Sequence, residues 1–215
     1  MKTARSSLIL SALLLMTLAC SVPLLERAEV IPGFSLAAGT GIATGRLTSG
    51  YSGVGNIRPP VLDYCLCPIG MFRLSYGMSP RLGLFLQGAA GPGFWLSETD
   101  SSAGTPLLYD FRAGPKFRVG DHGAVRAGLG LPGFLDLEYL HDFGRFLTGS
   151  AGLGLRGVSL GLCGRLCLSQ SVYLVAAGNT VLDWELLLQR HDLMPAASLG
   201  FAVEAGPLGQ PAAVR

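Results

Sequence analysis

The chain has 215 residues, which suits one compact domain, and its formal net charge is only +2. This charge, without a basic run interleaved with aromatic residues, argues against a nucleic-acid-binding protein. Charged residues make up 14% of the chain, against about a quarter in typical soluble domains, and the mean hydropathy is +0.45, so part of the surface is expected to lie in a solvent other than water.

The first residues have the pattern of an export signal. Lys2 and Arg5 precede an apolar run from Leu8 to Leu18, which is followed by Ala19 and Cys20. The run is short for a permanent membrane anchor, and no later stretch reaches about eighteen uninterrupted apolar residues. The sequence therefore predicts a signal peptide over 1–19 and argues against a helical membrane protein.

The end of this signal allows two kinds of processing. Thr17-Leu18-Ala19-Cys20 resembles a bacterial lipobox, in which Cys20 becomes the lipid-bearing first residue, although Thr17 departs from the aliphatic residue preferred there. Ordinary cleavage after Ala19 is the alternative, and both routes lead out of the cytoplasm. We expect residues 20–32 to form a linker before the folded domain.

Cysteine spacing constrains the chemistry of the exported domain. Cys65 and Cys67 fall in a long connection expected near 48–68, where a bent loop would be needed to link them. If Cys163 and Cys167 share a strand, their Cα atoms lie about 13 Å apart, beyond disulfide distance. No histidines accompany either pair at a zinc-site spacing, so no metal and no cofactor are expected.

Alternation of residue types replaces helical periodicity after the signal, most clearly between Tyr109 and Val119. Aromatic and apolar side chains occupy one face there, and four charged side chains occupy the other. This is the pattern of a strand with one face toward lipid and the other toward a lumen, although a soluble sheet would share it.

A repeated motif favours a membrane barrel. Residues 127–133 (AGLGLPG) return as 151–157 (AGLGLRG), 24 positions later, an offset that fits two strands of about ten residues with their turns. A nucleotide-binding interpretation of these glycines would need a following helix, which Pro132 and the alternating residues after it do not supply.

Short polar turns are expected near 79–81, 120–123, 141–144 and 169–171. Aromatic residues gather beside them, Tyr173 among them, which suits the interface between membrane and water. The other connections are uneven, with long stretches near 48–68, 92–106 and 180–193. Short turns at one end and longer loops at the other are typical of outer-membrane barrels. About ten strands are expected, near 34–46, 69–78, 81–91, 107–118, 123–132, 134–141, 145–155, 158–167, 172–180 and 194–205. Eight strands are the alternative, if 123–167 forms two long strands.

In architecture, the mature chain resembles the small bacterial outer-membrane barrels of the OmpA-like, OmpX-like and OmpW-like group. The resemblance implies an all-β, closed, antiparallel up-and-down transmembrane barrel over 33–206, in the outer membrane of a diderm bacterium. It implies outer-membrane lipid and the barrel-assembly machinery as partners, and no nucleic acid. Such barrels end on an aromatic residue, whereas here the segment 198–203 only approximates that signal and a tail over 207–215 follows.

The predicted faces assign six basic and four acidic residues to the lumen. They are Arg73, Asp110, Arg112, Lys116, Arg118, Arg126, Asp136, Glu138, Arg165 and Glu204. One interpretation is that these charges pair and fill a small barrel, and the other is a narrow, mildly anion-preferring channel helped by small lumen glycines. The sequence leaves this choice open.

Two further functions are alternatives to a channel. Catalysis would need a histidine at the outer rim, where His191 beside Asp192 is the candidate, but adjacent strand residues face opposite ways and a solvated pair is expected. We therefore expect no enzyme. A structural or adhesin-like protein acting through its surface loops is the alternative function, and a soluble exported β-sandwich lipoprotein is the main competitor to the barrel.

Overall fold

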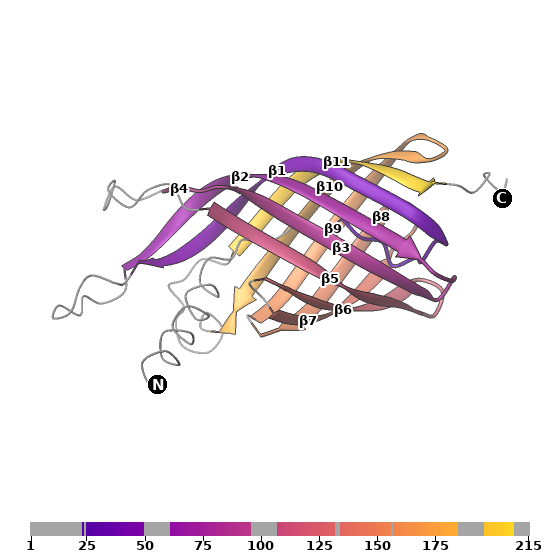
Figure 1. The fold of residues 1–215 in the computed structure, drawn as a ribbon, viewed down its shortest axis with the longest axis horizontal. Helices are drawn as coiled ribbons and strands as arrows, with labels where there is room; N and C mark the ends of the chain where they lie inside the picture. Colours follow the sequence, from indigo (N-terminus) through magenta and orange to yellow (C-terminus); the bar gives the residue numbers. More distant parts are fainter. Residues whose placement is uncertain are drawn as a thin grey trace, which may run out of the picture.

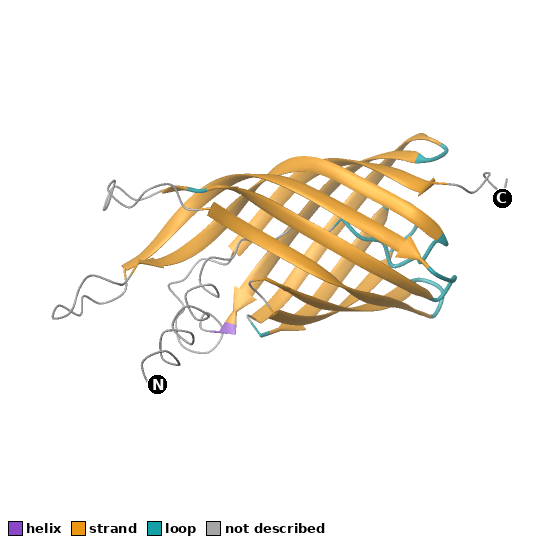
Figure 2. Ribbon diagram, viewed as in Figure 1, coloured by secondary structure: helices purple, strands orange, loops and turns teal. Residues whose placement is uncertain are grey.

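The computed structural model describes residues 23, 25–49, 61–95, 107–131, 134–155, 157–184 and 196–208. Within these residues, almost every element is a β-strand (Figures 1 and 2). The strands are β1 (Gly33–Ser49), β2 (Val61–Gly77), β3 (Leu82–Pro92), β4 (Phe94–Trp95), β5 (Leu107–Val119), β6 (Gly123–Leu131), β7 (Phe134–Asp142), β8 (Leu147–Gly154), β9 (Gly157–Ser169), β10 (Val172–Asp183) and β11 (Ala196–Leu208).

The strands form one closed antiparallel barrel. Each strand pairs with its neighbours along the chain, and β1 pairs with both β2 and β11, which closes the sheet. The short β4 pairs with Cys65 and Leu66 of β2 in the register of β3, so it continues β3 beyond Gly93. In the described part of the chain the barrel wall therefore contains ten strands, as predicted, and not eight. Among these residues, no helix is long and apolar enough to cross a membrane.

The outer and inner faces of the wall follow the predicted alternation. Along β5, Phe111 and Phe117 are exposed on the outside, whereas Asp110 and Lys116 are buried inside. The outer face carries large apolar side chains around the barrel, including Leu36, Leu86, Leu129, Leu137, Leu153, Leu162, Leu174 and Phe201. A water-solvated sheet would not leave this many apolar side chains uncovered, so this face is suited to lipid.

The predicted short turns lie together at one end of the barrel (Figure 2). They join β2 to β3, β5 to β6, β7 to β8 and β9 to β10. In the turn between β5 and β6, Gly120 has a φ of 71°, a left-handed conformation that glycine adopts without a Cβ penalty. The strand ends that flank the remaining connections lie at the opposite end, and most residues of those connections are outside the described ranges.

Three sequence-based expectations need correction. The strand expected from residue 69 begins at Val61, so Cys65 and Cys67 lie on β2 with buried side chains instead of in a loop. Pro68 and the short alternation around it concealed this strand, because proline is unusual inside a sheet. Tyr173, grouped with the aromatic residues of the membrane interface, points inward and packs against the core.

Candidate functional site: a filled barrel interior

The interior contains most of the charged side chains that alternation assigned to it. Nine of the ten residues lie in the interior, and Arg118 instead reaches the rim, where it donates hydrogen bonds to the backbone oxygens of Gly120 and Asp121 at 3.1 and 2.9 Å. The nine are Arg73, Asp110, Arg112, Lys116, Arg126, Asp136, Glu138, Arg165 and Glu204.

One layer of ion pairs links the strands on one side of the barrel. Arg112 of β5 contacts Asp110 at 2.7 Å and Asp136 of β7 at 3.2 Å. Next to it, Arg126 of β6 pairs with Glu138 of β7. These charges satisfy one another across neighbouring strands, which is how buried charges are tolerated.

Two glycines in this layer give room to charged side chains and do not leave an open path. A Cβ placed on Gly128 would meet the carboxylate of Asp136, and a Cβ on Gly152 would crowd Ser159 and Glu138. At these two positions, charged side chains take up the space that the channel interpretation assigned to a path. The two glycines allow the ion pairs to pack against the wall.

A second group of charges converges on Glu204 of β11. Its carboxylate lies 2.8 Å from Arg165 Nε of β9, 3.2 Å from an Arg73 guanidinium nitrogen of β2 and 3.3 Å from Arg27 Nε. Arg27 belongs to the segment before β1 and also stacks over the ring of Tyr173, with 4.4 Å between the guanidinium carbon and the ring centroid. One buried carboxylate thus joins three arginines from different parts of the chain.

Residues 25–31, which we call the inner segment, lie inside the barrel before β1. Leu25 and Glu26 are 0% and 1% exposed. The backbone oxygen of Leu25 accepts hydrogen bonds from Arg73 at 2.6 Å and from Arg165 at 3.0 Å. Just before the segment, the oxygen of Pro23 accepts a hydrogen bond from Gln87 of β3 at 2.8 Å. A stretch expected to be a linker is therefore bound within the lumen.

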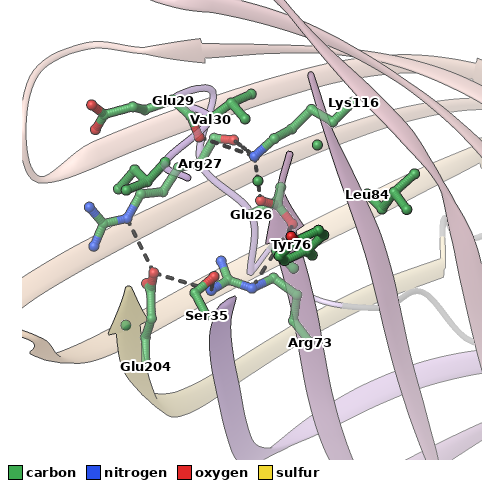
Figure 3. A pocket seen from close by; sticks show the side chains of 15 residues that line it. Glu26, Arg27, Glu29, Val30, Ser35, Arg73, Tyr76, Leu84, Lys116 and Glu204 are labelled. Carbon is green, nitrogen blue, oxygen red and sulfur yellow. Dashed lines mark hydrogen bonds and ion pairs between the residues drawn. The ribbon is translucent and has the colours of Figure 1, made fainter. Parts of the chain in front are cut away.

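The carboxylate of Glu26 occupies a polar cradle in the wall (Figure 3). Lys116 Nζ lies 2.6 Å from one oxygen, Ser75 Oγ donates to the other at 2.9 Å, and Arg73 Nε lies 3.9 Å from the latter. Burial alone would raise the pKa of Glu26, but the attraction of Lys116 and Arg73 outweighs it and holds the pKa well below its ordinary value. Glu26 is therefore bound as an anion.

The same lysine and a carboxylate at the short-turn end hold the backbone of the inner segment. Lys116 Nζ also donates to the oxygens of Arg27 and Glu29, at 3.2 and 3.1 Å. Asp142 of β7 accepts hydrogen bonds from the backbone nitrogens of Ala28 and Glu29 at 3.1 and 2.9 Å. One cavity beside the segment, lined by described residues that include Arg27, Ser75 and Lys116, has a volume of about 30 Å³, enough for about two water molecules.

The other candidate sites do not form a reactive centre in the described residues. His122 and His141 lie at the short-turn rim with ring centroids 6.3 Å apart, and Tyr139 Oη is 3.3 Å from His141 Nδ1. His191 and Asp192 lie outside the described residues, as does Cys20. No group of three or more histidine, cysteine or acidic side chains able to hold a metal occurs in the part of the chain that the structure describes.

Sequence reasoning missed the inner segment and the side chains of the wall that bind it. A charged cluster, Glu26-Arg27 with Glu29, stands a few residues after the predicted signal peptide in a chain that is otherwise poor in charge. That cluster could have indicated a segment bound inside the barrel, because the charged side chains predicted for the lumen would offer it partners. Nothing in the alternation of the strands could have shown that Leu25 presents its backbone oxygen to two arginines.

A closed antiparallel ladder with an apolar outer face and a charged interior defines a small outer-membrane β-barrel, because closure satisfies the backbone in lipid. No protein-family model and no curated protein matches the sequence. Among solved structures, the chain is similar to Ail, the attachment invasion locus protein of Yersinia pestis, with 14% sequence identity, coverage of 81% of this chain and 98% of that chain, and a TM-score of 0.35. A likeness at this identity and TM-score carries no argument. The class of small outer-membrane barrels is therefore assigned from the closed strand ladder and the apolar outer face of the protein itself.

Proposed function

We propose that this protein is an outer-membrane barrel that binds other molecules at its loop end. Its lumen does not conduct solutes while the inner segment occupies it. The observation that carries this proposal is the filled interior. The inner segment occupies the lumen, and the wall charges pair with it or with one another. The apolar outer face supports contact with outer-membrane lipid. A barrel in that membrane would be inserted by the barrel-assembly machinery.

The β1–β2 hairpin supports action at the loop end. Both strands have 17 residues, whereas about 9–11 residues suffice to cross a membrane. The pairing of β1 with β11 ends at Ala43, but its pairing with β2 continues to Ser49. At about 3.3 Å per residue, β1 continues about 20 Å past its pairing with β11 (Figure 1). On the other side β4 flanks β2 as far as Cys65, so the part that is two-stranded within the described residues spans 46–49 and 61–64. An extended two-stranded arm beyond the wall is suited to contact with another macromolecule.

Conductance measurements test whether the barrel is closed. In planar bilayers, the purified wild-type protein should produce no steady ion current, because the inner segment occupies the lumen and the described charges of the wall pair with it or with one another. A steady small current with anion preference would contradict the proposal and support the narrow-channel alternative.

Shortening the hairpin tests where the protein acts. Replacing residues 46–64 with a two-residue turn removes the projecting arm and leaves the pairing of β1 with β11 and of β2 with β3 intact. We expect the shortened protein to reach the outer membrane in normal amount and to lose the attachment of whole cells to host-cell or matrix surfaces that the wild type confers. Equal attachment by both proteins would show that the arm is not the interacting element.

A further inference from the structure

We propose that the inner segment is a displaceable plug, and that the cradle holding Glu26 is a binding site for small carboxylate anions that opens when the segment leaves. This goes beyond the closed state described above, because it assigns a ligand chemistry to the interior itself.

The cradle has the composition of a carboxylate site. Glu26 is held by an ammonium group, a hydroxyl group and a guanidinium group, from Lys116, Ser75 and Arg73 respectively. These groups come from β2 and β5, so the wall positions them, and Glu26 stands where the carboxylate of a solute would bind. Charge-assisted hydrogen bonds of this kind are the strong ones in a buried site.

Departure of the segment leaves one cation of the wall without a partner. Each hydrogen bond that Lys116 makes to a described residue ends on Glu26, Arg27 or Glu29. In contrast, Arg112 and Arg126 retain the acidic partners on the wall, and Arg73 and Arg165 retain Glu204. The opened interior would therefore attract an anion at Lys116, because an unpaired buried ammonium group is costly.

The way in which the segment is attached makes its departure possible. Within the described residues, side chains of the wall hold residues 25–31. Backbone pairing with the wall begins only after the segment, at Pro32, which forms a bridge with Gly77. Leaving the lumen therefore breaks hydrogen bonds and ion pairs and exposes the buried side chains of Leu25, Ala28 and Val30, but it opens no strand pair among the described residues. Pro32 is the point about which the segment would turn.

The test compares the wild type with a variant lacking residues 23–31, in planar bilayers bathed in potassium chloride or potassium acetate. Slower gel migration after heating serves as the control for folding of each variant. The wild type should be silent, and the deletion variant should show small currents that favour anions several-fold over potassium. Adding Lys116→Glu to the deletion should abolish or reverse this preference, since it replaces the unpaired cation with an anion.

A peptide added in solution tests the cradle directly. A synthetic peptide of residues 20–32 should close the channels of the deletion variant, and the same peptide with Glu26→Lys should not, because its ammonium group would face Lys116 and Arg73. A folded deletion variant that remains silent, or whose currents show no anion preference and no response to the peptide, would overturn the proposal while leaving the closed-barrel function intact.

A full-length variant covers the case in which the deletion prevents folding. Glu26→Lys retains the whole chain and replaces attraction in the cradle with repulsion, so it should fold and conduct. If this variant is silent, or fails to fold as the deletion did, the inner segment is a fixed part of the barrel core and the displaceable plug is wrong.

Discussion

Glu204 shows how single residues hold this interior together. Its carboxylate neutralises Arg165 and Arg73, which are 5% and 1% exposed, and it also contacts Arg27 of the inner segment. Removing one partner of a buried ion pair is far more costly than replacing both, because the remaining charges stay desolvated. The stability of the interior thus depends strongly on this one side chain.

We predict that Glu204→Ala lowers the free energy of unfolding by about 3–5 kcal/mol, because buried Arg165 loses the carboxylate that it pairs with and Arg73 loses the nearer of its two. Urea titration of the folded protein in detergent or lipid, followed by heat-modifiable gel migration, measures the change. The matched control is Glu29→Ala, which removes a carboxylate whose side chain is exposed. A loss of similar size in the control would mean that net charge, and not the buried cluster, sets the stability.

Alternation along the strands could be predicted from the sequence, but the partners of each charge could not. The inward position of Arg126 follows from a period of two, since Val125 and Ala127 must face the other way. That Lys116 binds the inner segment instead of a wall carboxylate depends on where a non-repetitive segment enters the barrel. No local pattern encodes such long-range pairing.

The seam between β1 and β11 is the element that closes the barrel, and it contains closely approaching backbones. A Cβ on Gly39 would overlap the backbone of Phe201 and Ala202, and one on Gly41 would overlap the backbone of Leu199 and Gly200. The seam therefore needs these glycines for space.

We predict that Gly39→Ala lowers the free energy of unfolding by about 1–3 kcal/mol, because the added methyl group meets backbone of β11 that cannot move aside. The control is Gly164→Ala in β9, where the nearest atom to the new Cβ is the oxygen of Ala176 at an ordinary 3.9 Å. Urea midpoints of the two variants give the comparison. A midpoint for Gly39→Ala equal to that of the control would show that the seam relaxes freely.

Strand positions were more predictable than strand lengths. The strand expected over 107–118 is observed as Leu107–Val119, and that expected over 134–141 as Phe134–Asp142. In contrast, β2 begins eight residues before its expected start at 69. Turn residues mark the strand ends clearly at the short-turn end of the barrel. The long β1–β2 hairpin continues past the wall, and no short polar turn marks the point where it leaves the wall.

At the scale of the whole molecule, the apolar outer band determines where the protein can be stable. Leu137, in the middle of β7, is 54% exposed, and its neighbours across the ladder are Ala127 and Leu153. In water such a surface would cause association, whereas in lipid it is solvated.

We predict that Leu137→Arg reduces the yield of folded barrel in the outer-membrane fraction, because a charge near the middle of the lipid-facing band costs about 2–4 kcal/mol. Leu137→Phe keeps the position apolar and should assemble normally. Fractionation followed by gel migration with and without heating measures both variants. Equal yields would contradict the assignment of this face to lipid.

Closure through the first and last strands also determines the order of biogenesis. The partner of β1 on one side, β11, is the last of the described strands along the chain, so it leaves the ribosome after the other ten elements. Every intermediate that lacks β11 therefore exposes an unpaired edge of β1, a surface on which another chain could add a strand. We therefore predict that truncation before Ala196, which removes β11, is more damaging to the yield of folded barrel in the cell than an equally long deletion within the β1–β2 arm.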